Sequence, residues 1–529
     1  MATRSVSRCS GSTAASCAGK ATACLGVHLN IEAILSGTEI ILTPTSIMLI
    51  LVSVLLGVLV GALPGLSSTM AVALLIPFTL ELEPVVAIAM MAALYCAGTF
   101  GGSITAILIN APGAPPAVAT ALDGYPLAQR GEAGRALGIA AISSVTGGIL
   151  SLLIFIFAAP LLARIALSFR PQEYFALTLF GLSMLAAISG KSSLRNLIAG
   201  LFGVLVSTIG IHLVTGIERF TFGTAVLYEG IDFIPVLIGI FAISEMLKQA
   251  QADEAVMERI RSVALRLPSR DDLRRVWATI LRSTGIGTII GILPAEGTTV
   301  AAIMGYNEAK RWSKHREEFG KGSVEGIAGP EAANNAGTSG AMVPTLALGI
   351  PGSGTTAVIL AALIMHGFRP GPFLMRETPE ILYAIFVAML IANVTFLFIG
   401  LMGAKVFSMI TLLPRTFLWP SVFCFAVVGA YAYQQQMFDV WVMLIAGLVG
   451  FYALRHGFGP APFVMGLVLG DLIEKNWSQS MIIFNSDWTR FFDSPISNLF
   501  FILTALSLAS PIIRLVFSRF MRKRASSPS

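Results

Sequence analysis

The chain has 529 residues, of which 55% are hydrophobic and 12% are charged, and its formal net charge is +6. Soluble domains carry roughly a quarter charged residues, so this composition excludes an ordinary soluble protein and predicts a surface that faces lipid. The basic residues cluster in short links between apolar runs, which is typical of cytoplasmic loops and excludes nucleic-acid binding as the reason for the positive charge.

Apolar runs of membrane-spanning length recur along the whole chain. Examples are the runs at 41–60, 136–159, 197–215, 381–401 and 499–517. We therefore predict an all-α polytopic membrane protein with about 12–15 apolar segments.

Composition and charge divide the chain into membrane and non-membrane parts. Residues 1–37 are expected to form an N-terminal extension, either disordered or produced by a start codon placed too early, because they fit neither a span nor a good signal peptide. The predicted parts that follow are a membrane repeat at 38–250, a basic cytoplasmic link at 251–275, a second membrane repeat at 276–476, an external loop and extra C-terminal span at 477–518, and a basic cytoplasmic tail at 519–529.

Two motifs that break helices occur twice. Gly-x-Leu-Pro at 61–64 returns at 291–294, an offset of 291 − 61 = 230 residues. Ala-Gly-Thr at 97–99, followed by Pro-Gly at 112–113, returns at 336–338 and 351–352, an offset of 336 − 97 = 239. Breaks at matching places in two halves of a membrane chain point to a transporter's binding site. Unwound backbone persists in a bilayer only where it is buried in protein or lines a water-filled cavity.

The charges around the broken segments indicate opposite orientations for the two halves. The pair of apolar segments at 41–80 has no basic residue at either end, whereas the pair at 276–309 is flanked by basic residues on both sides. The first pair is therefore expected to begin and end outside the cell, and the second inside. This pattern predicts an inverted-topology two-fold repeat, with each pair forming either full spans or re-entrant hairpins.

Several long motifs in order support a resemblance to a known family. They lie at 61–65, 95–105, 110–113, 291–297, 330–336 and 348–356. With them the chain resembles the large membrane subunit of the tripartite tricarboxylate transporters, the TctA family, over about residues 38 to 515. The resemblance implies an ion-gradient-driven importer subunit of the bacterial inner membrane, and not an enzyme. Its substrates would be tricarboxylates or related organic carboxylates, and its partners a small TctB-like membrane subunit and a TctC-like periplasmic solute-binding protein.

Hydroxyl side chains next to the breaks are the candidate substrate ligands. Each group would open a new half-helix, whose first N–H groups have no partner within the helix and carry partial positive charge. Such a place favours a carboxylate. The alternative is that small residues let the helices pack closely. The candidates are Ser67, Ser68, Thr69, Thr298, Thr299, Ser353, Thr355 and Thr356.

A coupling ion, Na⁺ or H⁺, requires oxygen ligands or a carboxyl group in the membrane. An intramembrane carboxylate is a functional hypothesis by default. The alternatives are an ordinary helix N-cap for the asparagines and an interfacial helix start for Glu331. No cofactor and no metal other than Na⁺ is expected. The candidate residues are Asn110, Glu296, Glu331, Asn334, Asn335 and Thr338.

Other classes of function fit the residues less well. The glycine-rich run at 349–356 lacks the lysine of a phosphate-binding loop, which excludes ATP hydrolysis by this chain. An intramembrane serine hydrolase would require a base at matching depth, and none of the five histidines is well placed. A passive organic-anion channel remains the main alternative to an importer.

Overall fold

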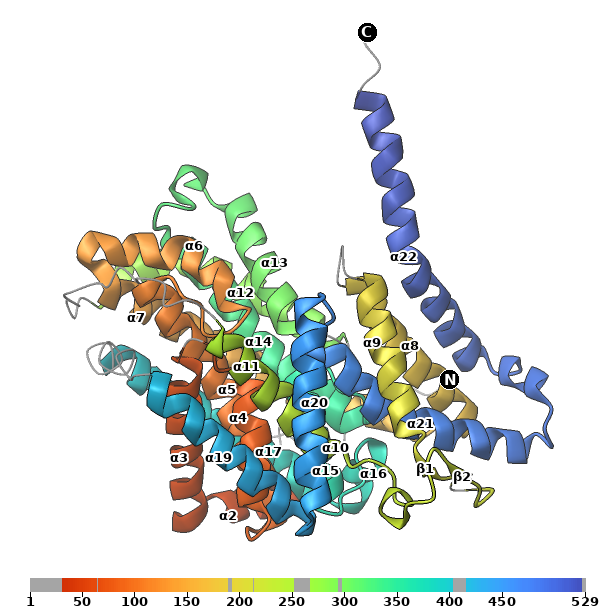
Figure 1. The fold of residues 1–529 in the computed structure, drawn as a ribbon. Coiled ribbons are helices and arrows are strands. Elements are labelled where there is room, and N and C mark those ends of the chain that lie inside the picture. Colours follow the sequence, from red (N-terminus) through yellow and green to blue (C-terminus); the bar gives the residue numbers. More distant parts are fainter. Residues whose placement is uncertain are drawn as a thin grey trace, which may run out of the picture.

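The computed structural model describes residues 31–63, 65–188, 193–212, 214–251, 267–293, 297–402 and 415–525. Most of these residues are helical (Figure 1). Strands β1 (Gly210–Ile211) and β2 (Glu218–Arg219) form a small antiparallel hairpin in which Gly210 pairs with Arg219. The predicted all-α class is confirmed.

The helices fall into two successive sets. The first set is α2 (Ile31–Ile41), α3 (Pro44–Gly61), α4 (Ser68–Leu75), α5 (Pro84–Ile109), α6 (Ala117–Leu127), α7 (Ala133–Ala166), α8 (Pro171–Ile188), α9 (Ser193–Ser207), α10 (Phe233–Ile238) and α11 (Ser244–Ala250). The second set is α12 (Arg270–Ile292), α13 (Gly297–Trp312), α14 (Val324–Leu348), α15 (Gly354–Met365), α16 (Pro372–Glu377), α17 (Pro379–Met402), α19 (Arg415–Gln434), α20 (Met437–Arg455), α21 (Pro460–Ile483) and α22 (Pro495–Ala525).

Short irregular helices complete the described chain. The 3₁₀ turns are Ile76–Thr79, Ala225–Leu227, Arg316–Glu318 and Trp488–Phe492, and the π turns are Ala128–Glu132 and Gly239–Ile243. The π turn at Gly239–Ile243 joins α10 to α11 in one continuous helical rod.

Six helical stretches in the described part of the chain are long and apolar enough to cross a membrane. They are Pro44–Gly61, Pro84–Ile109, Ala117–Ala166, Phe233–Ala250, Pro379–Leu401 and Met437–Arg455. Large apolar side chains such as Leu55, Phe157, Phe398 and Ile445 are exposed on these helices. Such a surface is stable in lipid and not in water, so the chain is a polytopic membrane protein.

Two helices, α5 and α14, form the centre of the fold. Every residue from Val85 to Leu108 in α5 and from Val324 to Ala347 in α14 is buried. Helix α5 packs against α3 and α17, and α14 packs against α12 and α7. Each central helix thus packs against a helix of its own set, α3 or α12, and against a helix of the other set, α17 or α7.

The glycines of the repeated motifs permit the same close approach twice. A Cβ atom added at Gly61 would collide with the backbone of Gly98 and lie 3.0 Å from Cα of Gly101. At Gly291 it would lie 2.6 Å from the carbonyl oxygen of Gly337 and 3.0 Å from Cα of Gly340. Only residues without a side chain allow helix backbones this close.

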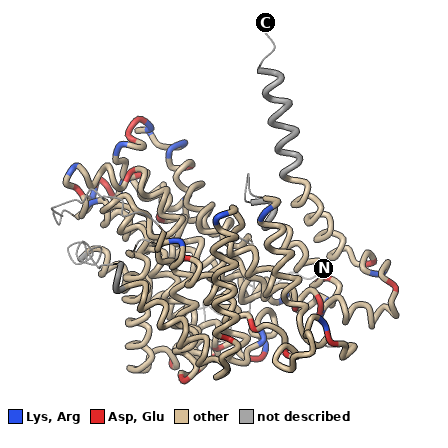
Figure 2. Tube along the Cα trace, in the orientation of Figure 1, with Lys and Arg blue, Asp and Glu red and all other residues tan. Residues whose placement is uncertain are grey.

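Charges are distributed unevenly over the two ends of the helix bundle. Lys and Arg gather mainly at its upper end in Figure 2, whereas α2, which contains Glu32 and Glu39, lies at the lower end. The last turn of α13 contains Lys310 and Arg311, and that of α20 contains Arg455. The positive-inside rule predicts that this end of the bundle faces the cytoplasm.

Candidate functional site

All four breaks predicted from the sequence separate two helices. The breaks lie between α3 and α4, α5 and α6, α12 and α13, and α14 and α15. The α5 and α14 ends are alike: each is capped by a left-handed residue, Asn110 with φ 53° and Gly349 with φ 73°. Those two residues are 239 positions apart, as are the Pro-Gly pairs that follow them.

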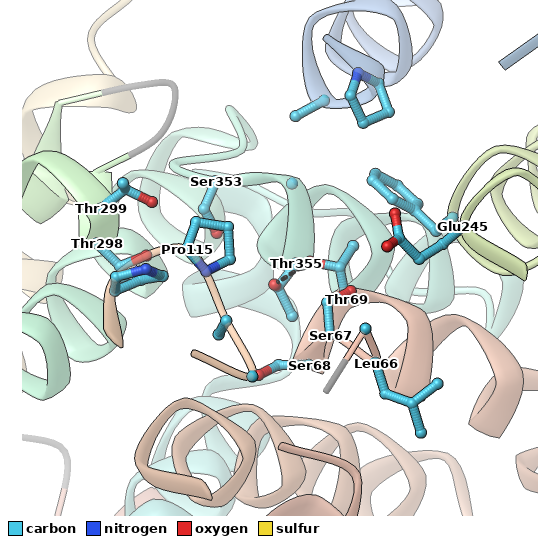
Figure 3. Close-up of a pocket in the computed structure, with 18 of the residues that line it drawn as sticks. Leu66, Ser67, Ser68, Thr69, Pro115, Glu245, Thr298, Thr299, Ser353 and Thr355 are labelled. Atoms are coloured by element: carbon cyan, nitrogen blue, oxygen red, sulfur yellow. Dashed lines mark hydrogen bonds between the residues drawn. The ribbon is translucent and has the colours of Figure 1, made fainter. Parts of the chain in front are cut away.

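The helices that follow the breaks begin around one cavity of about 480 Å³. Seven of the eight predicted substrate ligands line it: Ser67, Ser68, Thr69, Thr298, Thr299, Ser353 and Thr355 (Figure 3). They come from the starts of α4, α13 and α15, and residues 112–116 and Val118 at the start of α6 complete this wall. A volume of this size is typical of a small-molecule site.

Serine side chains cap two of these helices. The hydroxyl of Ser67 accepts a hydrogen bond from the backbone N–H of Met70 at 3.2 Å, and that of Ser353 accepts from Thr356 N–H at 3.2 Å. A cap satisfies one of the four unpaired donors at a helix start and leaves others for a ligand. With the partial positive charge of each helix start, the wall suits an anion without a buried basic residue.

Hydroxyl groups from both halves of the chain meet in this wall. Thr69 Oγ1 lies 2.7 Å from Thr355 Oγ1, and the hydroxyl of Tyr95 lies 3.3 Å from Ser353 Oγ. Thr356 lies behind the wall: it is fully buried, and its hydroxyl accepts the Ser353 backbone N–H at 2.8 Å. Its predicted contact with substrate stays a prediction.

Comparison with known proteins identifies the family. The model of the tripartite tricarboxylate transporter TctA family matches residues 47–465. A protein of Agrobacterium vitis described as an uncharacterized 52.8 kDa protein in the TAR-I ttuC′ 3′ region is 38% identical over 483 residues, which cover 91% of this chain and 95% of that protein. The chain belongs to the TctA family.

Further comparisons agree with this membership. A second Agrobacterium vitis protein, from the TAR-II ttuC′ 3′ region, is 36% identical over 211 residues, which cover 40% of this chain and 87% of that protein. No solved structure matches the chain. TctA proteins are transporter subunits and not enzymes, and membership implies partner subunits and a carboxylate substrate.

The described ion-coupling candidates of this TctA protein do not line the cavity. Glu331 is completely buried in α14, and hydroxyls from three other helices donate to its carboxylate: Ser103 of α5, Thr120 of α6 and Ser144 of α7, the last at 2.7 Å. The alternative that Glu331 is an interfacial helix start is wrong, because α14 begins seven residues earlier with Ser323 as its cap.

Asn334 and Asn335 are buried inside α14, so the alternative that they cap a helix is also wrong. Among the residues that the structure describes, none forms a hydrogen bond with the side-chain amide of either. Thr338 is buried on the same helix; its hydroxyl donates to the carbonyl of Asn335 at 2.7 Å and lies 3.8 Å from Cys96 Sγ. Buried amides without partners are costly, so the positions of these two side chains require an explanation.

The remaining two candidates are placed differently. Asn110 is exposed and forms the left-handed end of α5, where asparagine is one of the few residues that adopt this conformation readily. Glu296 lies outside the described residues, as do Pro64 and Pro294.

Sequence reasoning missed the side of the cavity opposite Thr298 and Thr299. Glu245, Lys248 and Gln249 of α11 line the cavity there, and Figure 3 shows the Glu245 carboxyl facing it. The signal was present as Glu and Lys three residues apart at the end of an apolar run, but such pairs are common on solvated helix ends. Tyr95 and Thr99, inside a motif that identified the family, also line the cavity.

Proposed function

We propose that this chain carries tri- or dicarboxylates across the bacterial inner membrane, driven by a gradient of Na⁺ or H⁺. A TctC-like periplasmic protein would deliver the substrate, and a TctB-like small subunit would complete the transporter. The observation that carries this proposal is the meeting of helix starts from both halves of the chain around one hydroxyl-lined cavity. That arrangement is how secondary transporters hold an anionic substrate without a buried cation.

The two halves are proposed to be an inverted repeat that works by alternating access. The recurring close approaches at Gly61 and Gly291 and the exchanged packing of α7 and α17 support a repeat. Lys248 and Leu454, which line the cavity, belong to the last turns of α11 and α20, and the Lys248 side chain is 55% exposed. Arg455, in the last turn of α20 at the basic end of the bundle, supports a conformation in which the site opens to the cytoplasm.

The coupling site is proposed to lie on α14. Glu331, Asn334, Asn335 and Thr338 supply a carboxylate, two unpartnered amides and a hydroxyl within two turns of one buried helix. One turn separates Ser103, which donates to Glu331, from Thr99 in the cavity wall. A change in the charge of Glu331 would therefore act close to the substrate.

Uptake by proteoliposomes that contain the chain with its two partners tests this function. The expected result is accumulation of a carboxylate above its outside concentration under an imposed Na⁺ or pH gradient, each applied separately. A passive channel would only equilibrate the carboxylate, and that outcome would contradict the proposal.

A further inference from the structure

The cavity contains a carboxylate of the protein itself, although its opposite wall suits an anion. Glu245 and Lys248 both line the cavity. Among the described lining residues, they are the two that carry a charge. The two side chains leave α11 on the same face, three residues apart. Lys248 Nζ lies 3.2 Å from both carboxylate oxygens of Glu245.

Gln249 connects this pair to the first break. Its Nε2 donates to Glu245 Oε1 at 2.8 Å. Its side chain also lies against Gly65, where an added Cβ would be 2.5 Å from Gln249 Cδ. Gly65 has φ +90°, which a residue with a side chain rarely adopts, so the contact depends on glycine. Gln249 therefore connects the Glu245–Lys248 pair of α11 directly to the break between α3 and α4.

The ion pair between Lys248 and Glu245 is open to water. The Lys248 side chain is 55% exposed and that of Glu245 is 21% exposed. Pairs this open to water contribute little to stability because solvent screens them and long side chains lose freedom. A carboxylate that enters the cavity can therefore compete with Glu245 for the same ammonium group.

We propose that Lys248 binds a second carboxylate of the substrate and that Glu245 holds Lys248 in place while the site is empty. The helix starts bind one carboxylate group, and Lys248 takes another at the opposite side of the cavity. Lys248 thereby selects acids with two or more carboxylates over monocarboxylates. This inference rests on the proposed function, because it requires the cavity to be the substrate site.

Calorimetric titration of the full-length chain in lipid nanodiscs tests the role of Lys248, with citrate, succinate and propionate as probes. Lys248→Gln is expected to raise the Kd for citrate and succinate at least tenfold and to leave the Kd for propionate within twofold. Lys248→Arg, which keeps the charge, is expected to stay within threefold for citrate. Glu245→Gln removes the competing carboxylate and is expected to tighten citrate binding about threefold.

Arg274 and Asp271 provide a matched control, because they are also three residues apart on one helix and do not line the cavity. Both side chains are highly exposed, and Arg274 Nη1 lies 3.9 Å from Asp271 Oδ1. Arg274→Gln is expected to leave all three Kd values unchanged. The proposal is overturned if Lys248→Gln binds citrate as the native chain does, or weakens propionate as much as citrate. If Lys248→Gln does not fold, unchanged citrate binding by Glu245→Gln overturns it.

The same titrations separate this inference from the proposed function. A native chain that binds none of the three acids contradicts the function itself. A native chain that binds citrate, with binding weakened by Thr355→Val but not by Lys248→Gln, contradicts the role of Lys248 alone.

Discussion

Thr69 and Thr355 bring their hydroxyl oxygens to 2.7 Å from each other although 286 positions separate them in the chain. One lies at the start of α4 in the first half, and the other at the start of α15 in the second. The contact joins the two halves inside the cavity wall. One of the two hydroxyls donates its proton to the other oxygen, so the proton of the second hydroxyl is available to a ligand.

Replacing Thr355 by Val tests this contact with almost no change in side-chain shape. We expect citrate affinity to fall by roughly 10- to 100-fold, because a hydrogen bond to a charged group contributes about 1.5–3 kcal/mol. Calorimetric titration measures the change. Thr146→Val is the control, since the Thr146 hydroxyl donates to the carbonyl of Ile142 on its own helix. Equal affinities for the Thr355 variant and the native chain would show that this hydroxyl does not touch substrate.

Replacing Glu331 by Gln tests ion coupling. The amide keeps an oxygen for the donating hydroxyls, so we expect the chain to fold, but it cannot carry a proton or a negative charge. Uptake in proteoliposomes is expected to lose its response to either the Na⁺ or the pH gradient while citrate still equilibrates. If both responses persist in the variant, Glu331 has no part in coupling.

Replacing Glu331 by Ala has a different expected effect, on stability. The change leaves the hydroxyls of Ser103, Thr120 and Ser144 buried without their acceptor. Each unsatisfied group costs about 1–3 kcal/mol, so we expect a clearly lower unfolding temperature than for Glu331→Gln. Thermal unfolding in detergent measures it. Equal unfolding temperatures for the two variants would contradict the hydrogen bonds described.

The close helix crossing at Gly291 can be tested with a control on the same helix. Gly291→Ala places a Cβ atom against the backbone of Gly337, and we expect a loss of about 1–3 kcal/mol from overpacking. Gly285→Ala, where nothing lies within 4 Å, is expected to be neutral or to stabilise α12 by up to about 1 kcal/mol. Thermal unfolding of both variants checks the difference. A Gly291 variant as stable as the Gly285 variant would contradict the crossing.

The sequence was sufficient to find the breaks and most of the hydroxyl side chains that line the cavity wall next to them. Proline and glycine act locally, so Pro112, Gly113, Pro351 and Gly352 mark helix ends wherever the fold places them. Hydroxyl residues next to those breaks must lie at helix starts, which explains why the sequence could select Ser68 and Thr355.

Features that depend on distant contacts could not be found in this way. Glu245 and Lys248 look like an ordinary solvated helix end, and only the packing of α11 over the first break places them at the cavity. The alternative of a helix start at Glu331 was wrong, because Pro330 is tolerated within α14 and Ser323 is its cap. The hydroxyls around Glu331 come from α5, α6 and α7, so no local pattern contains them.

A structure of the complete transporter with bound citrate would show where the substrate binds. We predict citrate in the cavity, with one carboxylate at hydrogen-bond distance from residues at the starts of α4 and α15, among them Thr69 and Thr355. Citrate bound elsewhere, with this cavity empty or filled by lipid, would show that the cavity is not the substrate site.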